Sequence, residues 1–209
     1  MTIRIFVDEG QRYHATVTAL MFNRAAQVLV GHCELKRHKK CELIQGGWED
    51  HEPLRNAFFR EVREEAGLRQ EDVFFIAASR EFPAYSAPFS LSWGKQGRTQ
   101  LSCAAFLLKD GVSPTVTAEP DGEPQEFSAM DWVDLPQIPE LCVGYKRETY
   151  RKIVEAFLPV TTAIREICGQ PDSENLVYAV RDTAALRKSK ALTLNMPSAF
   201  PGQPLQATL

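Results

Sequence analysis

The sequence predicts an α/β or α+β domain. Three observations predict this class. First, 209 residues are enough for one domain with a well-buried core and an extension. Second, hydrophobic residues make up 44% of the chain and charged residues 24%, an ordinary globular balance. Third, short apolar runs bounded by turn residues alternate with two segments of helical periodicity.

Five segments are predicted to be strands because apolar and β-branched residues fill them and turn residues bound them. The first two flank Asn23 and Arg24, which indicate a turn, and we expect them to form a hairpin. Residues 34–42 are basic and are expected to be a loop; residues 110–125 hold three prolines and are expected to be another. The predicted strands span residues 13–22, 26–33, 72–81, 101–108 and 126–133.

Two helices are predicted from apolar stripes at helical spacing. The first spans residues 53–66, with Pro53 in its first turn and Gly67 at its C-terminal end. The second spans residues 146–158. The two stripes are Leu54, Ala57, Phe58 and Val62, and Tyr150, Ile153, Val154 and Phe157.

After Pro159 the pattern weakens. Residues 161–168 could be helical, and residues 187–209 hold three prolines and few aromatic residues, which predicts an irregular tail.

Charge and cysteine content limit the partners and the compartment. A formal net charge of −3 argues against broad non-specific binding to nucleic acid, which needs a basic face, but leaves room for a local basic groove. No run of about 18 apolar residues is present, so no membrane span is expected, and the N-terminus is too short in apolar length for a secretory signal. Five scattered cysteines without a Cys-x-x-Cys pair predict a reduced, cytoplasmic chain without a zinc site; an organelle is not excluded.

Three glutamates of the first predicted helix share one face. Positions three and four apart lie together on a helix, so Glu61, Glu64 and Glu65 project together. These carboxylates repel one another, and a hard divalent cation that prefers oxygen ligands resolves the repulsion. Gly46 and Gly47, before the helix, let the backbone approach a ligand closely. The alternative is a solvated acidic face, the usual meaning of a charge run.

This stretch resembles the Nudix box, whose pattern is Gly, five residues, Glu, seven residues, and then Arg-Glu-apolar-x-Glu-Glu-x-Gly-apolar. Because glycine and arginine positions also agree, the solvated face is disfavoured. The resemblance implies the Nudix fold, a mixed β-sheet sandwiched between α-helices, with residues 1–159 as the Nudix hydrolase domain. Residues 160–209 are expected to be a C-terminal extension, partly helical and then irregular. The matching residues are Gly46, Glu52, Arg60, Glu61, Val62, Glu64, Glu65, Gly67 and Leu68.

The resemblance also implies the chemistry, in which a metal-activated water attacks phosphorus and cleaves a phosphoanhydride bond. Arg60 and Glu52 would pair and orient the helix. One carboxylate takes the proton of the water; the candidate is Glu64, with Glu65 or Glu126 as alternatives. Glu126 lies outside the box, and its alternative role is an exposed glutamate at a strand end. The ligands of Mg²⁺ (or Mn²⁺) would be Glu61, Glu64, Glu65, Glu126 and the carbonyl of Gly46.

Three motifs outside the box carry a closer resemblance. They are Gln45 directly before the glycine pair, Glu126-Phe127 four residues before Trp132-Val133, and Tyr145-Lys146-Arg147 two residues before Tyr150-Arg151. Together they resemble the bacterial RNA 5′-pyrophosphohydrolases and the related diadenosine tetraphosphate hydrolases, over roughly residues 13–158.

The closer resemblance implies a set of residues at the substrate. Lys146 and Arg147 would meet its phosphates as cations; the alternative is a solvated start of the second helix. Tyr145 or Tyr150 would stack on a base, although Tyr150 also lies on the apolar stripe, where core packing is the alternative. The complete set is Gln45, Gly47, Tyr145, Lys146, Arg147 and Tyr150.

The leading hypothesis is a hydrolase for a dinucleoside polyphosphate or the 5′-triphosphate end of RNA. Gly46-Gly47-Trp48-Glu49 also resembles the diphosphoinositol polyphosphate hydrolases, which typically carry lysine in place of Gln45. A basic pocket without base-stacking aromatic residues would favour that activity. A third hypothesis is a non-catalytic Nudix binding module or subunit, which the intact box disfavours. Residues 160–209 are candidates for contact with a protein partner or for self-association, and no membrane partner is expected.

Overall fold

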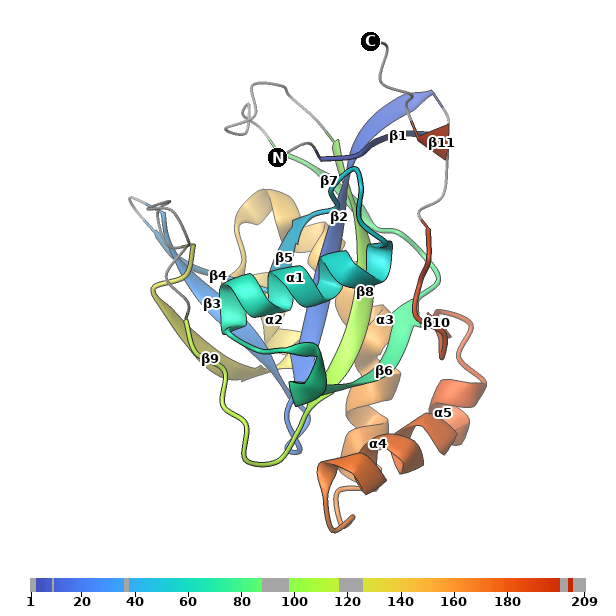
Figure 1. Ribbon diagram of the computed structural model, residues 1–209. Helices are drawn as coiled ribbons and strands as arrows, with labels where there is room; N and C mark the ends of the chain where they lie inside the picture. The colour runs from blue at the N-terminus through green and yellow to red at the C-terminus, as the bar shows by residue number, and fades with distance from the viewer. Residues whose placement is uncertain are drawn as a thin grey trace.

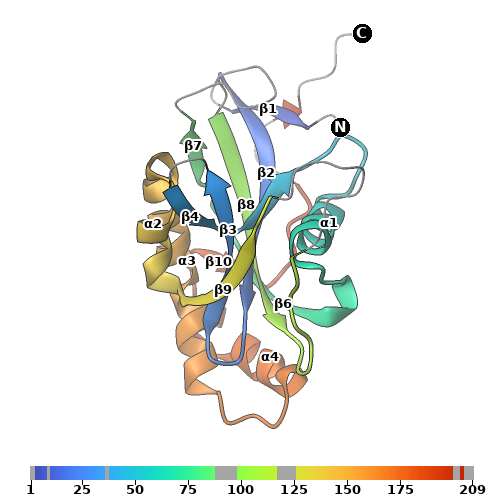
Figure 2. The same cartoon turned by 90° about the vertical axis from the view of Figure 1, so that its left-hand side faces the viewer.

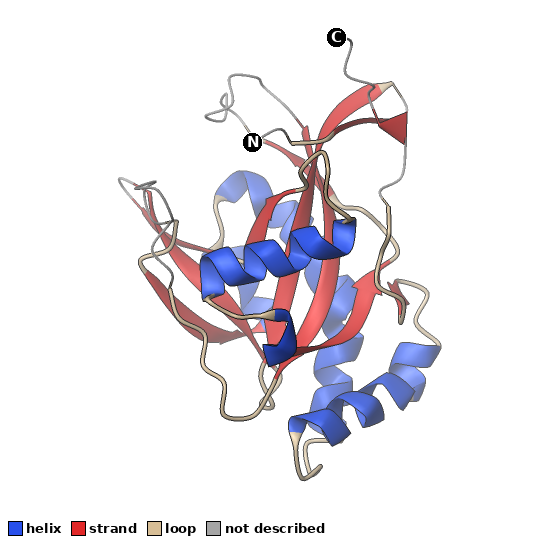
Figure 3. Ribbon diagram, in the orientation of Figure 1, coloured by secondary structure: helices blue, strands red, loops and turns tan. Residues whose placement is uncertain are grey.

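The structure, a computed structural model, describes residues 3–8, 10–35, 38–87, 98–116, 126–199 and 203–204. One mixed sheet with helices on both faces forms its centre (Figure 1, Figure 3). The helices are α1 (Leu54–Ala66), α2 (Ile138–Leu141), α3 (Arg147–Glu166), α4 (Ser173–Asp182) and α5 (Ala184–Arg187), with 3-10 turns at Gln70–Asp72, Leu135–Gln137 and Gly144–Lys146. The strands are β1 (Ile5–Asp8), β2 (Gln11–Phe22), β3 (Gln27–Leu35), β4 (His38–Glu42), β5 (Ile44–Gly47), β6 (Val73–Ser79), β7 (Ala84–Ser86), β8 (Arg98–Leu108), β9 (Ala129–Asp134), β10 (Leu192–Thr193) and β11 (Gln203–Pro204).

Strand β2 organises the sheet. It runs parallel to β8 from Tyr13↔Arg98 to Phe22↔Leu107, and antiparallel to β1 and β5. Beyond β8 the order continues through β6 to β10 at the edge. Strand β3 meets β2 in the pair Phe22↔Val28 and then pairs with β4 and β9. The predicted hairpin is therefore confirmed at its turn, after which the two strands diverge.

Helices cover the sheet from both sides, which confirms the predicted fold class. Figure 2 shows α1 on one side and α2 and α3 on the other. Residues 15–22 of β2 are buried on both faces, and this stretch holds six apolar residues and two threonines but no charged residue. Its side chains still enter two cores in turn: Met21 faces the α1 side with Phe58, while Phe22 faces the α3 side with Tyr150 and Phe157.

The predicted loops are partly wrong. The loop predicted at residues 34–42 is wrong at residues 34–35, which end β3, and at residues 38–42, which form β4 and pair with β3. Pairing with a neighbouring strand stabilises β4 although its sequence is polar. Residues 36–37 lie outside the described residues. In the second predicted loop, residues 110–116 contain no helix or strand, and residues 117–125 lie outside the described residues.

Helix α3 is longer than predicted, because it continues through Pro159 to Glu166. Val160, Ala163 and Ile164 extend its buried stripe. Their burial compensates for the roughly 3 kcal/mol that an internal proline costs a helix. The helix therefore crosses the boundary predicted at residue 159, and the division into a Nudix domain and a C-terminal extension stays a prediction.

Residues beyond α3 pack against the same core. Helices α4 and α5 place Leu176, Val180 and Leu186 there, and β10 adds Leu192 and pairs with β6. In the tail predicted to be irregular, residues 187–209, the described residues 188–191 and 194–199 contain no helix or strand. The prediction is wrong at Arg187, which ends α5, and at residues 192–193 and 203–204, which form β10 and β11. In the part of the chain that the structure describes, no helix is long and apolar enough to cross a membrane.

Candidate active site

Helix α1 is held firmly at both ends and along one face. It begins after Pro53, whose φ of −62° suits the position before a helix, and it ends at Gly67 with φ 64°. Gly67 donates its N–H to the carbonyl of Arg63 at 3.0 Å, an end that favours glycine. Phe58 and Val62 are fully buried in the α1-side core. The helix is thus a rigid support for its carboxylates.

Strand β5 lies directly against those carboxylates. A Cβ on Gly46 would stand 2.0 Å from Cδ of Glu61, so the Glu61 carboxyl group keeps this position only beside a glycine. The backbone N–H of Gln45 donates to Oε2 of Glu65 at 3.0 Å. Glu61 is 7% exposed and Glu65 is 4% exposed. Two carboxylates are therefore packed between a helix and a strand backbone.

Arg60 connects these parts through its guanidinium group. Nη2 donates to Glu52 at 2.8 Å and to the Gly47 carbonyl at 2.6 Å. Nη1 donates to Oε1 of Glu61 at 2.6 Å and to Oε2 of Glu64 at 3.0 Å. Burial lowers the pKa of Arg60, but the hydrogen bond with Glu52 and the charge of Glu61 raise it above its ordinary range. Arg60 thus stays charged and fixes the loop before α1 to the helix.

The carboxylates are poorly neutralised despite Arg60. Burial raises the pKa of Glu61 to about 7; Arg60 opposes this shift, and Glu64 and Glu126 add to it. Burial also raises the pKa of Glu65 well above its usual value, with further contributions from the charges of Glu126 and Glu61. Oε1 of Glu65 is buried and has no hydrogen-bond partner among the described residues. Three glutamates of α1 and Glu126 are therefore close enough to act on one another electrostatically, and Arg60 offsets their negative charge only in part.

Glu126 lies at the start of the segment that leads into β9. The next residue, Phe127, is 2% exposed, and its ring packs so closely on Gly31 that a Cβ there would stand 2.3 Å from the ring. The charge of Glu126 acts on the carboxyl group of Glu65 and raises its pKa. The contact of Phe127 with β3 thus places Glu126 opposite α1.

The donor set fits a hard divalent cation, although it is not yet arranged as a ligand shell. In the described ranges, no group of three or more His, Cys, Asp or Glu side chains is arranged to hold a metal ion. Glu61 and Glu64 are turned towards Nη1 of Arg60 instead. Crowded carboxylates and the buried, unpartnered Oε1 of Glu65 are the oxygen donors that Mg²⁺ and Mn²⁺ prefer. Metal binding would require Glu61 and Glu64 to exchange Arg60 for the cation.

Two of the residues expected at the substrate are buried. Lys146 is 4% exposed; its Nζ forms an ion pair with Glu42 and lies 5.2 Å from the ring centre of Tyr85. Tyr150 is fully buried, and its hydroxyl donates to Oε1 of Gln45 at 3.1 Å. The ring of Tyr150 belongs to the core, which agrees with the packing alternative. Its hydroxyl supports Gln45, whose own N–H binds Glu65.

Tyr145 and Arg147 lie on either side of Lys146 but have different surroundings. Tyr145 is half-buried, and its ring centre is 5.7 Å from that of Tyr85. Arg147 binds α2: its Nε donates to the Pro139 carbonyl at 3.1 Å, and its Nη2 is 3.6 Å from Glu140. The start of α3 thus directs the guanidinium group of Arg147 towards α2.

No sequence pattern indicated that three further residues near the site matter: Tyr85, Glu42 and Cys33. Burial and the charges of Glu42 and Glu126 raise the pKa of the Cys33 thiol to about 12, so both carboxylates lie close enough to Cys33 to act on it. The available signal was weak, since Tyr85 stands in a three-residue strand and Glu42 precedes β5 in a stretch expected to be a loop.

Comparisons with known proteins agree with this geometry. The sequence model of the family described as NUDIX domain matches residues 12–157. An RNA pyrophosphohydrolase of Novosphingobium aromaticivorans is 35% identical over 152 residues, which cover 71% of this chain and 94% of that protein. An RNA pyrophosphohydrolase of Sphingopyxis alaskensis is 32% identical, with 71% and 94% covered.

Solved structures show the same fold at low sequence identity. The dihydroneopterin triphosphate pyrophosphohydrolase of E. coli matches with a TM-score of 0.51 at 19% identity, over 68% of this chain and 94% of that one. A binary complex of the Ap4A hydrolase of C. elegans matches with a TM-score of 0.50 at 14% identity, over 69% and 96%.

Proposed function

Because the chain belongs to the Nudix family and is a hydrolase of phosphoanhydride bonds, we propose that its substrate is the 5′-triphosphate end of RNA. The observation that carries the proposal is the packing of β5 on α1, in which Gly46 and Gln45 contact the carboxylates of Glu61 and Glu65. The names of the similar curated proteins support RNA as the substrate class. A dinucleoside polyphosphate presents the same nucleoside and polyphosphate groups and is the competing substrate.

In this proposal the cation is Mg²⁺ or Mn²⁺, held by Glu61, Glu64, Glu65, Glu126 and the Gly46 carbonyl. When bound, it supplies Lewis-acid chemistry at the phosphoryl oxygens and lowers the pKa of a water. Arg60 and Glu52 keep the loop of Gly47 fixed on α1 and hold the carboxylates in place.

Glu64 is the proposed general base. Its side chain is 22% exposed, against 9% for Glu61, so it reaches solvent more easily than the buried glutamates. A base must lie within hydrogen-bond reach of the water from which it takes a proton. The exposure of Glu64 supports that role, and Arg60 Nη1 at 3.0 Å orients one of its oxygens.

Tyr145 is the proposed base-stacking residue, because its ring is only half-buried while that of Tyr150 is fully buried. Tyr145 beside Tyr85, together with the neutralisation of Lys146 by Glu42, supports a nucleotide over an inositol polyphosphate. We also propose that the enzyme is cytoplasmic, because its cysteines are scattered along the sequence without a Cys-x-x-Cys pair.

Product analysis tests the proposal directly. Purified protein, its Glu64→Gln variant and a Glu155→Gln control are offered 5′-triphosphate RNA, diadenosine tetraphosphate and a diphosphoinositol polyphosphate, each with Mg²⁺ or Mn²⁺. Glu155 is an exposed helical glutamate outside the site. We expect turnover of RNA that is lost in Glu64→Gln and kept in Glu155→Gln. If the protein turns over only the tetraphosphate or only the inositol compound, that compound replaces RNA as the assigned substrate. If folded protein turns over none of the three, a non-catalytic module is favoured.

A further inference from the structure

The segment beyond the matched family range carries a concentrated positive charge. The chain as a whole has a net charge of −3, yet residues 181–190 hold four cations and one anion, a local charge of +3. The cations are Arg181, Arg187, Lys188 and Lys190, and the anion is Asp182. This local excess lies in α4, α5 and the turn that leads to β10.

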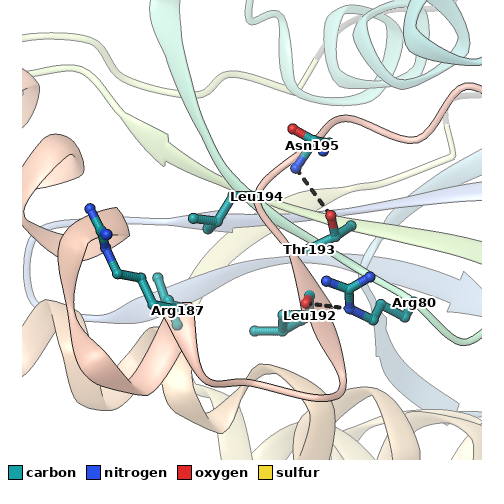
Figure 4. Close-up of a pocket in the computed structure, with 7 residues that line it drawn as sticks. Arg80, Arg187, Leu192, Thr193, Leu194 and Asn195 are labelled. Carbon is teal, nitrogen blue, oxygen red and sulfur yellow. Dashed lines mark hydrogen bonds between the residues drawn. The ribbon is translucent and has the colours of Figure 1, made fainter.

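A hollow of about 540 Å³ opens beside this segment. Arg80, at the end of β6, and Arg187, on α5, stand on opposite sides of it, and Leu192, Thr193 and Leu194 lie between them (Figure 4). Its volume is within the range of small-ligand sites. Leucine side chains with arginines beside them suit a nucleotide unit, whose base and ribose are partly apolar and whose phosphate is anionic.

Three cations of this surface are not neutralised by the part of the chain that the structure describes. Arg80 makes one side-chain hydrogen bond there, from Nε to the Leu192 carbonyl at 2.8 Å, so its terminal nitrogens are available to another partner. Lys188 and Lys190 are exposed and form no ion pair with described residues. Arg187, by contrast, pairs with Asp182. We call Arg80, Lys188, Lys190 and the hollow the basic edge.

The basic edge lies across the sheet from the candidate active site. The strand order from β10 through β6, β8 and β2 to β5 contains four strand spacings. At about 4.8 Å each, they separate β10 from the Gly46 strand by roughly 20 Å. A stacked single strand advances about 3.4 Å per nucleotide, so roughly six nucleotides would span this distance.

We propose that the basic edge binds the phosphate backbone of a single-stranded RNA whose 5′ end occupies the active site. This inference rests on the proposed function, which supplies the RNA. A second copy of the chain fits less well, because a two-fold contact through this surface would bring like charges together. The basic edge would hold RNA without reading its sequence, since phosphate contacts carry no base information.

Binding without turnover tests the proposal. Anisotropy measures binding of 5′-monophosphate RNAs of four and thirty nucleotides, in the absence of divalent metal, to wild type, to Lys188→Glu/Lys190→Glu and to Arg80→Gln. A matched Arg69→Glu/Lys152→Glu variant makes the same charge change at exposed positions elsewhere. Thermal melting verifies that each variant is folded.

We expect the thirty-nucleotide RNA to bind at least tenfold more weakly to the double variant, and the four-nucleotide RNA to bind equally to all proteins. The slope of log K against log salt should become shallower by about 1.4 for two lost contacts with a single strand. The proposal would be overturned if the matched variant weakened binding of the thirty-nucleotide RNA equally. It would also be overturned if the double variant weakened binding of the four-nucleotide RNA as well. If wild type hydrolyses no 5′-triphosphate RNA but the length-dependent loss is present, the basic edge stands and the proposed function fails.

Discussion

Replacing Gly46 by alanine tests the arrangement of β5 and α1 on which the site depends. The new methyl group would stand 2.0 Å from both Cδ and Oε1 of Glu61, and 2.1 Å from Oε2. The carboxyl group would have to recede by about 1.4 Å to reach ordinary contact. It would then leave its 2.6 Å hydrogen bond with Arg60.

The size of the effect follows from those two changes. Overpacking of a tight site costs about 1–3 kcal/mol. The hydrogen bond between Glu61 and Arg60 joins two charged groups, and such bonds contribute about 1.5–3 kcal/mol. We therefore expect Gly46→Ala to lower the free energy of unfolding by about 2.5–6 kcal/mol. For a chain of this length, that lowers Tm by at least roughly 5 °C.

Calorimetry with and without Mn²⁺ separates stability from metal binding. A cation that binds the native state raises Tm by mass action, and this rise should shrink in Gly46→Ala because Glu61 is displaced. Gly169→Ala is the matched control, since a Cβ at Gly169 meets nothing within 4 Å. The reasoning is refuted if Gly46→Ala melts within about 2 °C of Gly169→Ala and keeps the full Mn²⁺ effect.

Three further predictions concern the same site. In the metal-free protein, the pKa of Glu61 is raised from 4.5 to about 7, so the native state binds more protons than the unfolded state between these pH values. The free energy of unfolding should therefore fall by on the order of 3 kcal/mol as the pH rises from 4.5 to 7. Urea unfolding should show a flatter pH profile for Glu61→Gln, and an identical profile would contradict this. Arg60→Lys should lower the free energy of unfolding by about 3 kcal/mol, because an ammonium group cannot replace the planar guanidinium group and at least two hydrogen bonds of about 1.5 kcal/mol each are lost. An unchanged midpoint of urea unfolding would disprove it. Gly31→Ala should displace Phe127 and lower the free energy of unfolding by about 1–3 kcal/mol. It should also weaken Mn²⁺ binding, because Glu126 moves with Phe127. Titration calorimetry measures that affinity, and an unaltered affinity would count against the prediction.

The sequence was most informative where local spacing alone determines structure. Periodicity predicted α1, and Gly67 marked its end, because both depend on neighbours within a few residues. The same spacing predicted that Glu61 and Glu65 lie together. The close approach of Gly46 was expected from its lack of a side chain, although its partner, Glu61, became known only from the packing of β5 on α1.

Features that depend on distant residues could not be predicted in the same way. Strand β4 is polar and is defined by its pairing with β3. The partner of Lys146 is Glu42, which is 104 positions away in the chain. Arg147 binds the Pro139 carbonyl and Glu140 on α2, contacts that its place beside Lys146 did not indicate, and its role at the phosphates stays a prediction. In each case tertiary contacts decide the partners, and no local pattern encodes them.

The continuity of α3 has a practical consequence for anyone trimming or exchanging parts of this enzyme. The matched family range ends at residue 157, in the middle of that helix. A truncated protein that stopped there would lose Val160 and Ile164 and would uncover the face of Phe22 and Phe157. Such a fragment should expose apolar surface and aggregate on expression. Chimaeras with shorter relatives therefore need a replacement for this helical turn as well as a new end.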